Sequence, residues 1–530
     1  MLHEDKIWIA TKATGEAICL LPQKANRHVL ITGLSNKEVD RTARILAEGF
    51  SSLGTPVFIT DINRDLEGMM APGNGSESIQ ETVPCMELEK SGFCFQGFPV
   101  TLWDVSGETG IPLRANIGEM GPVLLSQIMQ LSVHQSDTLK TIFRIADSRG
   151  LSLISVNDIK AIVNYIRNRA REYEGEYGQI KTTDLDGIMR ALVRLESEVT
   201  ALFWGETALN IADLIAFKIE GKGMINVLEA KFLVRNRPFY ASVLLWLLSE
   251  LCESLPEAGE LDCPKMAFII DEANLLFRDN NRVFIEKTEQ VIRKLSKKGV
   301  SVIFCTQKMQ DIPDNVLRHL ENRIQHSPYA YTPAQLKEVR CVASLFRKNP
   351  AFDTFEALTT LTSGEALLSL IGENNLPCPV EKGYLLPPQS YMGRVSDTDR
   401  EHCIKGNILY SKYARRYDSE AAYNVLKRIE IEEEIAAEKA KEEADKAKEL
   451  AKREAERFKE EARREQLIAN VQKRVKKSAG NSVSSPKGKT ESVPSSKKSS
   501  KKTKRKPGKM IGGNLGERIG RGIIGTLFKN

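Results

Sequence analysis

The chain of 530 residues lacks any apolar run that approaches the roughly 18 to 20 residues needed to cross a bilayer. Its first residues include Glu4 and Asp5, and they lack the basic segment followed by an apolar segment that marks a secretory signal peptide. These absences argue against a membrane-spanning protein. They predict a cytoplasmic protein without a membrane partner.

The chain also lacks a C-x-x-C pair, although it has nine cysteines. Most zinc sites need cysteines at such a short spacing, and a disulfide framework needs an even number of them. We therefore expect reduced thiols, most of them buried, and neither a structural zinc site nor a disulfide framework.

Short and nearly continuous apolar runs recur up to residue 371, with helical periodicity between them. Such runs are typical of parallel strands covered by helices on both faces, so the sequence predicts an α/β fold with a mostly parallel sheet. The predicted strands are residues 29–32, 56–61, 99–104, 223–228, 266–271, 300–306 and 365–371. Ligands of such sheets bind at the carboxyl ends of the strands, so the polar residues there should point toward one edge. These residues are Asp61, Asp104, Asp271 and Gln307.

Composition divides the chain into further segments. Between residues 120 and 216 helical periodicity dominates, which predicts a helical insertion within a core of residues 1–418. Residues 419–477 combine Glu, Lys, Ala and Arg with many opposite charges at helical spacing, so they predict a long exposed helix without a sustained heptad seam. Residues 478–509 are rich in Ser and Lys, which predicts a disordered linker. Residues 510–530 regain apolar residues among glycines, as a docking segment would.

One strand carries the acidic motif of a nucleotide site. Apolar residues 267–270 are followed by Asp271 and Glu272. In P-loop ATPases an aspartate at this place orders the magnesium shell, and the next residue is often a glutamate that activates water. An Asp-Glu pair is also common at solvated turns, but the apolar run before it favours the nucleotide site. Gln307 ends the following strand and is either a sensor of the γ-phosphate or an ordinary polar strand end.

The glycine-rich loop that should hold the phosphates is broken. The pattern G-x-x-x-x-G-K-[ST] supplies backbone N–H groups, a lysine for the outer phosphates and a hydroxyl for magnesium. Only Gly33 fits this pattern after the first strand. Glu38, Val39 and Asp40 stand at the positions of the second glycine, the lysine and the hydroxyl residue.

This degenerate phosphate loop, residues 33–42, leaves few contacts for a nucleotide. The remaining candidates are Gly33, Ser35 and Lys37, together with the N-terminus of the following helix. Two carboxylates would face a polyphosphate there. The sequence therefore puts the binding of ATP and Mg²⁺ in question, with Asp271 as the magnesium residue where a nucleotide does bind.

The chain resembles the HerA-like P-loop ATPases of the FtsK/HerA superfamily, most closely their bacterial YjgR-like subgroup. The matching stretches are residues 25–33, 56–68, 142–151, 255–277, 297–326 and 349–358, and DIPDNVL at 311–317 is especially specific. The resemblance implies a RecA-like core in a hexameric ring that encircles or pumps duplex DNA. It implies that Asp271 and Glu272 form the Walker B pair and that Arg323 is a candidate for reaching a neighbour's nucleotide. The Walker A of the subgroup, G-A-T-G-T-G-K-T, has no match here.

Three functions remain open from the sequence. The leading hypothesis is a DNA-associated or regulatory ring subunit with little or no intrinsic ATPase activity, beside an active partner ATPase or nuclease. The alternative is an active ATP-dependent DNA translocase or helicase in which Lys37 or Arg41 replaces the missing lysine. A tethered interaction protein that works through its helix and basic tail is the third. The absence of G-x-G-x-x-G after the first strand disfavours a dinucleotide-dependent dehydrogenase.

Overall fold

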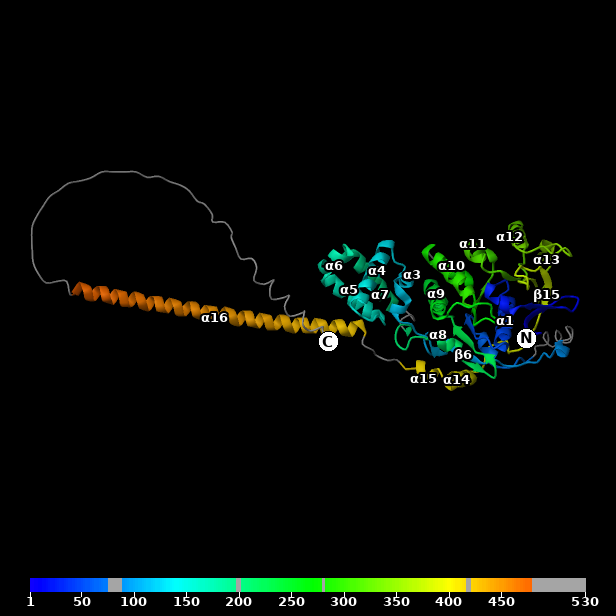
Figure 1. Ribbon diagram of the computed structural model, residues 1–530, viewed down its shortest axis with the longest axis horizontal. Helices are drawn as coiled ribbons and strands as arrows, with labels where there is room; N and C mark the ends of the chain where they lie inside the picture. The colour runs from blue at the N-terminus through cyan, green and yellow to red at the C-terminus, as the bar shows by residue number, and fades with distance from the viewer. Residues whose placement is uncertain (75–87, 197–201, 279–281, 416–420, 479–530) are drawn as a thin grey trace, which may run out of the picture. The chain divides into compact units, whose positions relative to one another are not determined.

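The computed structural model describes residues 1–74, 88–196, 202–278, 282–415 and 421–478 (Figure 1). The chain divides into two compact units, residues 1–438 and 439–530. The predicted linker beyond Ser478 and the predicted docking segment 510–530 lie outside the described residues. The domain boundaries given above stay predictions.

The centre of the first unit is a sheet that contains 13 strands of the described residues. Its parallel part runs in the order β13-β4-β12-β11-β5-β10-β6-β7. These strands are β4 (Val29–Thr32), β5 (Val57–Asp61), β6 (Val100–Asp104), β7 (Ile111–Pro112), β10 (Ile225–Glu229), β11 (Met266–Ile270), β12 (Val300–Thr306) and β13 (Asn322–Gln325). The prediction of a mostly parallel α/β sheet is confirmed.

The other part of the sheet is antiparallel. It comprises β1 (Leu2–His3), β2 (Lys6–Thr11), β3 (Ala17–Leu20), β14 (Glu365–Ser369) and β15 (Glu381–Leu385). The prediction that the late strand at 365–371 is parallel is wrong, because β14 runs antiparallel to both β13 and β15. All of its residues are buried, and burial on both faces produces an apolar run whatever the direction of the strand.

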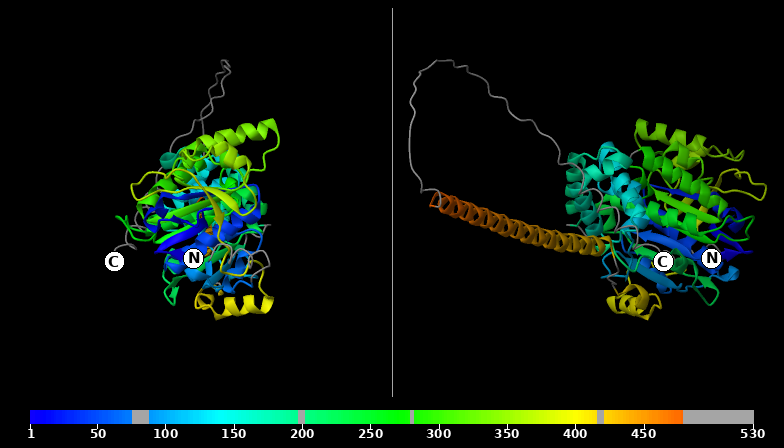
Figure 2. Two further views of the ribbon diagram at one scale, coloured as in Figure 1. Left: turned by 90° about the vertical axis from the view of Figure 1, so that its right-hand side faces the viewer. Right: turned by 60° about the vertical axis from the view of Figure 1, so that its left-hand side comes forward.

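Helices cover both faces of the sheet (Figures 1 and 2). Successive strand residues alternate between two cores, as the pleat requires. In β11, Ile269 belongs to the core under α1 (Asn36–Ser52), whereas Phe268 and Ile270 belong to the core on the opposite face. That opposite face carries α9 (Arg237–Ser254) and α10 (Arg282–Lys297).

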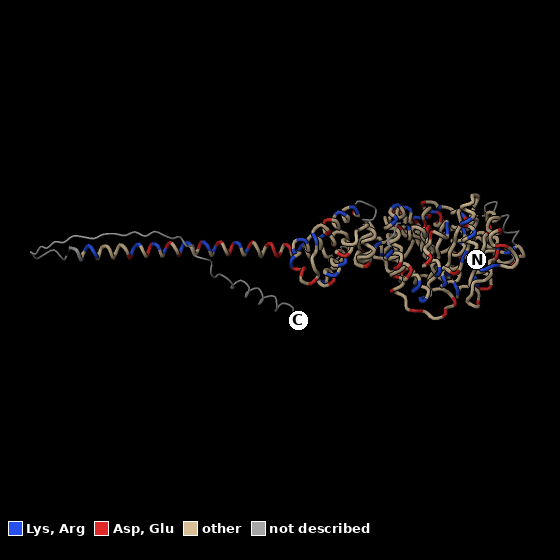
Figure 3. Tube along the Cα trace, turned by 90° about the horizontal axis from the view of Figure 1, so that it is seen from above, with Lys and Arg blue, Asp and Glu red and all other residues tan. Residues whose placement is uncertain are grey.

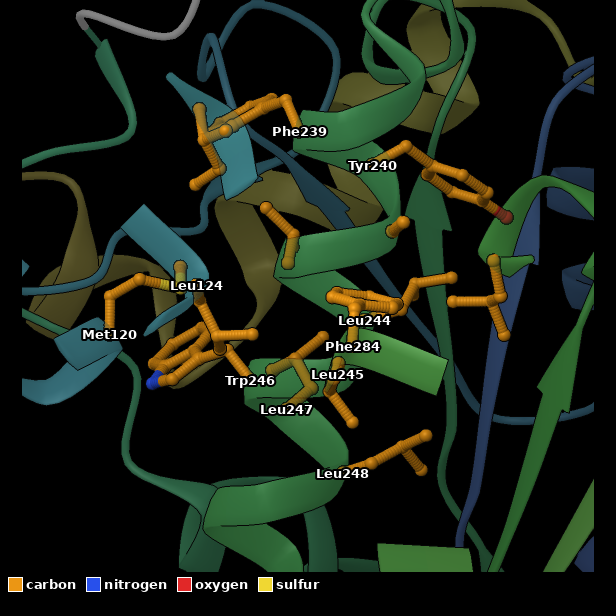
Figure 4. Packing of buried hydrophobic residues seen from close by; sticks show 14 of the residues in the cluster. Met120, Leu124, Phe239, Tyr240, Leu244, Leu245, Trp246, Leu247, Leu248 and Phe284 are labelled. Atoms are coloured by element: carbon orange, nitrogen blue, oxygen red, sulfur yellow. The ribbon is translucent and has the colours of Figure 1, made fainter. Parts of the chain in front are cut away.

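Helix α9 is apolar around its whole circumference because it is covered on all sides. Figure 4 shows Trp246 lying beside Met120 and Leu124, while Tyr240 points away from them. Most of its side chains between Phe239 and Leu248 are fully buried. Burying each large aliphatic or aromatic side chain contributes about 1.5–3 kcal/mol, so this helix joins the sheet to the helices beyond it.

The helices beyond α9 lie between β7 and β8 in the chain. They are α3 (Ile117–Ile128), α4 (Val133–Ser148), α5 (Val156–Asn168), α6 (Ala170–Tyr177), α7 (Thr182–Glu196) and α8 (Ile211–Ile215). They occupy the segment where helical periodicity dominates the sequence. A two-stranded ribbon, β8 (Lys218–Ile219) and β9 (Lys222–Gly223), follows them.

The remaining α-helices of the described residues follow β12 in the chain. They are α11 (Asp314–Leu317), α12 (Pro333–Ser344), α13 (Thr354–Thr359), α14 (Asp397–Gly406), α15 (Tyr410–Tyr413) and α16 (Ala422–Ser478). Helix α16 has 57 residues, so the described residues contain the long helix that the charge pattern predicts. None of the described helices combines the length and the apolar character that crossing a membrane requires.

Candidate nucleotide site

The order of the parallel strands brings the predicted site residues to one edge of the sheet. β12 lies between β4 and β11, so Gly33, Gln307 and Asp271 directly follow three adjacent strands of the same direction. The N–H of Gly33 donates to the carbonyl of Thr306 at 3.3 Å. This bond ties the ends of β4 and β12 together at the carboxyl edge, which is the candidate nucleotide site.

The Asp271–Glu272 turn is fixed by its neighbours. The N–H of Asp271 donates to Thr60 Oγ1 at 2.8 Å, and the Tyr240 hydroxyl donates to the Asp271 carbonyl at 2.9 Å. The N–H of Glu272 donates to Asp271 Oδ1 at 2.8 Å. Glu272 has φ 48° and ψ 49°, a left-handed conformation that costs a residue other than glycine about 1–3 kcal/mol. Strain of this kind clusters at functional turns, which supports the nucleotide-site interpretation of this strand end.

An asparagine that the sequence analysis missed connects the acidic motif with the glutamine. Asn36 Nδ2 lies 3.4 Å from Glu272 Oε1, and Gln307 Nε2 lies 3.4 Å from Asn36 Oδ1. Gln307 Nε2 also lies 3.5 Å from Glu272 Oε1. These are long hydrogen bonds between exposed groups, so each is weak. The structure thus brings Glu272 and Gln307 together, with the side chain of Asn36 between them.

Helix α1 takes the place of the phosphate loop. It begins at Asn36, so only residues 33–35 join it to β4, whereas the G-x-x-x-x-G-K-[ST] pattern places four residues between its two glycines. Glu38 is helical and buried, and its Oε1 accepts the N–H of Gly364 at 3.1 Å. Val39 is buried in the core under α1. The residues that replace the second glycine and the lysine therefore face the protein.

Gly33 has a packing role in this structure. A Cβ on Gly33 would lie 2.6 Å from Cβ of His326, which follows the neighbouring strand β13. His326 is fully buried and its Nε2 lies 3.1 Å from Thr42 Oγ1 of α1. The close approach between two strand ends is thus sufficient to require a glycine here.

Carboxyl groups crowd the position of a magnesium ion. Burial and the charge of Asp61 raise the pKa of Asp40 to about 7, although Arg44 opposes this shift. Burial and the charge of Asp40 raise the pKa of Asp271 well above its usual range. Both carboxyls therefore keep a proton to a higher pH than a free aspartate does. Such a group repels the oxygens of a triphosphate.

The other two strand-end aspartates organise turns. The carboxylate of Asp61 accepts the backbone N–H groups of Arg64, Asp65 and Leu66 at 2.7–3.2 Å. The carboxylate of Asp104 accepts N–H groups of the loop that follows β6, including that of Thr109 at 3.2 Å. Both lie at the predicted edge, but they are committed to backbone groups of their own loops.

Two of the three basic candidates, Arg41 and Arg323, bond to backbone carbonyls. Arg41 donates to the carbonyls of Leu385 and Leu386, both at 3.0 Å, so its guanidinium faces the end of β15. Arg323 donates to the carbonyls of Leu320 and Leu345 at 3.2 and 2.7 Å. Its action on a neighbouring subunit stays a prediction. Lys37 is exposed in the first turn of α1.

The residues present do not fit an ATP–Mg²⁺ complex. The position of the magnesium-binding hydroxyl holds the half-buried carboxyl of Asp40, and that of the phosphate-binding lysine holds buried Val39. No group of three or more His, Cys, Asp or Glu residues in the described parts of the chain is arranged to hold a metal ion. Ser35 precedes α1, and its hydroxyl accepts no N–H of the first turn.

Comparisons with known proteins find one family model that matches nearly the whole chain, and several similar solved structures. The family model described as "Helicase HerA-like C-terminal" matches residues 6–529. VirB4 of Thermoanaerobacter pseudethanolicus is 16% identical, with a TM-score of 0.47, over 73% of this chain and 97% of that one. The bacterial conjugative coupling protein TrwB is 11% identical, with a TM-score of 0.49, over 74% of this chain and 91% of that one. No curated protein sequence is significantly similar to this chain.

Proposed function

The chain belongs to the HerA-like family of P-loop NTPase folds, and we propose that it is a ring subunit of this family that neither binds nor hydrolyses ATP to a useful extent. Its role would be DNA-associated or regulatory, beside a partner that supplies ATP turnover. The observation that carries this proposal is the start of α1 at Asn36, because the helix fills the place where a phosphate loop would curl.

Chemistry supports the loss of turnover. In P-loop ATPases a lysine stabilises the charge that develops on the transferred phosphoryl group. Val39 stands at that position and is 4% exposed, so neither its side chain nor its location can take over this role. Asp40 adds a carboxyl where an ATPase binds a cation. Glu272 and Gln307 remain at the edge, where both contact the side chain of Asn36.

Nucleotide binding and turnover of the full chain test this proposal. We expect no measurable ATP binding at millimolar nucleotide and no turnover above background. The informative variant combines Glu38→Gly, Val39→Lys and Asp40→Thr, and we expect partial recovery of ATP binding from it. Turnover near one per second in the native chain that disappears in Glu272→Gln would falsify the proposal.

An active ATPase with an unusual phosphate loop remains the alternative. The observation that favours it is Lys37, an exposed cation in the first turn of α1, where the helix N-terminus also attracts anions. This alternative predicts that the chain binds ATP and that Lys37→Ala abolishes the binding. Lys24→Ala is the matched control, because it removes a lysine near the opposite ends of the strands, and it should leave ATP binding unchanged.

A further inference from the structure

Helix α16 carries an uneven charge along its length (Figure 3). Between residues 422 and 445 it has eight acidic and four basic side chains, whereas between 446 and 475 it has ten basic and six acidic ones. The side chains between residues 430 and 475 are exposed. A helix with an acidic first half and a basic second half is complementary to a second copy of itself that runs in the opposite direction.

Large apolar side chains lie near both ends of the same face. Ile431 and Ile435 are 47% and 48% exposed, and Leu467 and Val471 are 65% and 55% exposed. Ile431 and Leu467 are separated by 36 residues, or about ten turns, and so are Ile435 and Val471. All four side chains therefore project from one side of the helix, although the two pairs are far apart along it.

Charged residues fill this face between the apolar ends. They recur at intervals of three or four residues, as one face of a helix requires. The residues are Glu442, Lys446, Glu449, Arg453, Arg457, Glu460 and Arg464. The same face is thus apolar at its ends and carries charges of both signs in its middle.

We propose that α16 pairs with α16 of a second copy of this chain, antiparallel, in the register that sets Ile435 opposite Val471. In an antiparallel pair, each step forward on one helix is a step back on the other. The register therefore fixes every other facing pair. It sets Glu442 opposite Arg464, Lys446 opposite Glu460, and Glu449 opposite Arg457.

Each of these facing pairs joins opposite charges and occurs twice in a symmetric pair. Exposed ion pairs contribute only about 0–1 kcal/mol each, so their main effect is to select direction and register. Ile435 opposite Val471 and Ile431 opposite Val475 supply buried apolar area, whereas Leu467 faces Lys439. At the centre Arg453 faces its own counterpart, and its ion pair with Glu449 at 3.1 Å within the same helix reduces this repulsion.

A parallel pair is disfavoured by the same residues. Parallel helices in equal register place each residue beside its own counterpart, so Glu442 would face a glutamate and Arg464 an arginine. Like charges at facing positions destabilise a pair. The antiparallel pair has a two-fold axis. The pairing involves no residue of the candidate nucleotide site, so its test is independent of the test of the proposed function.

Zero-length carbodiimide cross-linking of the full native chain, followed by mass spectrometry, tests the register. We expect an amide link between Lys446 and Glu460. These residues are 14 positions apart in one helix, or about 21 Å along its axis, which is too far for a link within one chain. Links from Lys446 to Glu442 or Glu449 say nothing about direction, because both glutamates lie within one turn of Lys446 in the same helix, Glu442 at 3.4 Å. The absence of the Lys446–Glu460 link at concentrations where the chain associates overturns the proposal.

Charge reversal provides the matched control. The variant Arg457→Glu with Arg464→Glu should lose the Lys446–Glu460 link, and mixing it with Glu442→Arg plus Glu449→Arg copies should restore it. The control variant Lys452→Glu with Lys459→Glu makes the same charge change about 100° away around the helix and should keep the link. A link that survives the first variant contradicts the register. The basic half of α16 could instead bind duplex DNA. In that case Arg457→Glu with Arg464→Glu lowers the affinity for duplex DNA, and the native chain gives no Lys446–Glu460 link. This result also overturns the proposal.

Discussion

Asp40 is the residue that separates this site most clearly from a nucleotide-binding one. A hydroxyl at this position helps to bind magnesium, whereas a carboxyl close to Asp271 creates repulsion that only a proton or a cation relieves. Burial and the charge of Asp61 raise the pKa of Asp40 to about 7. The residue that we propose to exclude a phosphate therefore also makes the stability of the site depend on pH.

The pH dependence of Asp40 has a definite sign. Its folded pKa of about 7 lies above the unfolded value of about 3.9, so its contribution to stability is complete below pH ~4 and is lost as the pH rises toward 7. We expect Asp40→Asn to raise the free energy of unfolding at pH 8 by at least the ~1.4 kcal/mol of one pKa unit. Calorimetry at pH 5 and pH 8 checks this, with exposed Asp137→Asn as the control. An equal pH slope in the Asp40 variant and the native chain would contradict it.

Gly33 offers a test of packing against phosphate binding. Because its missing Cβ would lie 2.6 Å from Cβ of His326, Gly33→Ala should destabilise the fold by about 1–3 kcal/mol in the absence of any nucleotide. Urea unfolding measures this cost. Gly175→Ala is the matched control, since nothing lies within 4 Å of the Cβ it would add. Equal stability of the two variants would show that His326 makes room for the methyl group.

At the scale of elements, burial patterns predict strands well and their directions poorly. The sequence predicts β4, β5 and β11 to within a residue or so because both of their faces are covered. β15 is missed because Tyr384 and its polar neighbours Glu381 and Lys382 are not fully buried. The direction of β14 depends on its partners in the sheet, which its own residues do not encode.

The start of α1 could have been predicted from the sequence. Ser35 and Glu38 fit the S-x-x-E signal of a helix N-terminus, and the helix does begin between them, at Asn36. The expected reciprocal hydrogen bonds do not form, because the Glu38 carboxylate accepts the N–H of distant Gly364 instead. That contact depends on tertiary structure. So do the approach of Asn36 to Glu272 and the burial that raises the pKa of Asp40.

His28 connects three elements and gives a prediction at this scale. It precedes β4, its Nε2 lies 2.9 Å from the carbonyl of Ile292 in α10, and its Nδ1 accepts the N–H of Val302 in β12 at 3.0 Å. His28→Ala leaves both backbone groups buried without this partner. Since an unsatisfied buried group costs ~1–3 kcal/mol, we expect a loss of about 2 kcal/mol or more. Denaturant unfolding measures it, and exposed His134→Ala is the control.

The charge state of His28 adds a second observable. Burial lowers its pKa to about 4, below the unfolded value of about 6.5. The neutral ring therefore stabilises the fold above pH ~6.5, and this contribution is lost as the pH falls toward 4. The stability difference between the native chain and His28→Ala should shrink over that range. A difference that stays constant with pH would show that the ring takes up no proton on unfolding.

At the scale of the whole molecule, the proposed ring and the proposed pairing of α16 require different symmetries. Neighbours in a cyclic ring are related by rotation about one axis, whereas an antiparallel helix pair needs a two-fold axis across it. The two are compatible when α16 connects two rings, or two subunits outside a ring, and incompatible when it connects neighbours within one ring. Two rings that face each other across two-fold axes satisfy both.

The last prediction at the scale of the whole chain concerns non-specific binding of duplex DNA. The formal net charge is +6, and lysines concentrate in residues 497–506, within the predicted linker that lies outside the described residues. Each phosphate that a lysine neutralises releases condensed counterions, so duplex affinity should fall with salt at a log–log slope of about −0.9 per phosphate contact. The linker lacks aromatic residues, so it can stack on no bases and should show little sequence preference. Salt titration of the full chain and of a truncation ending at Lys477 checks this, and equal affinity and slope in both would mean that the lysines are merely solvated.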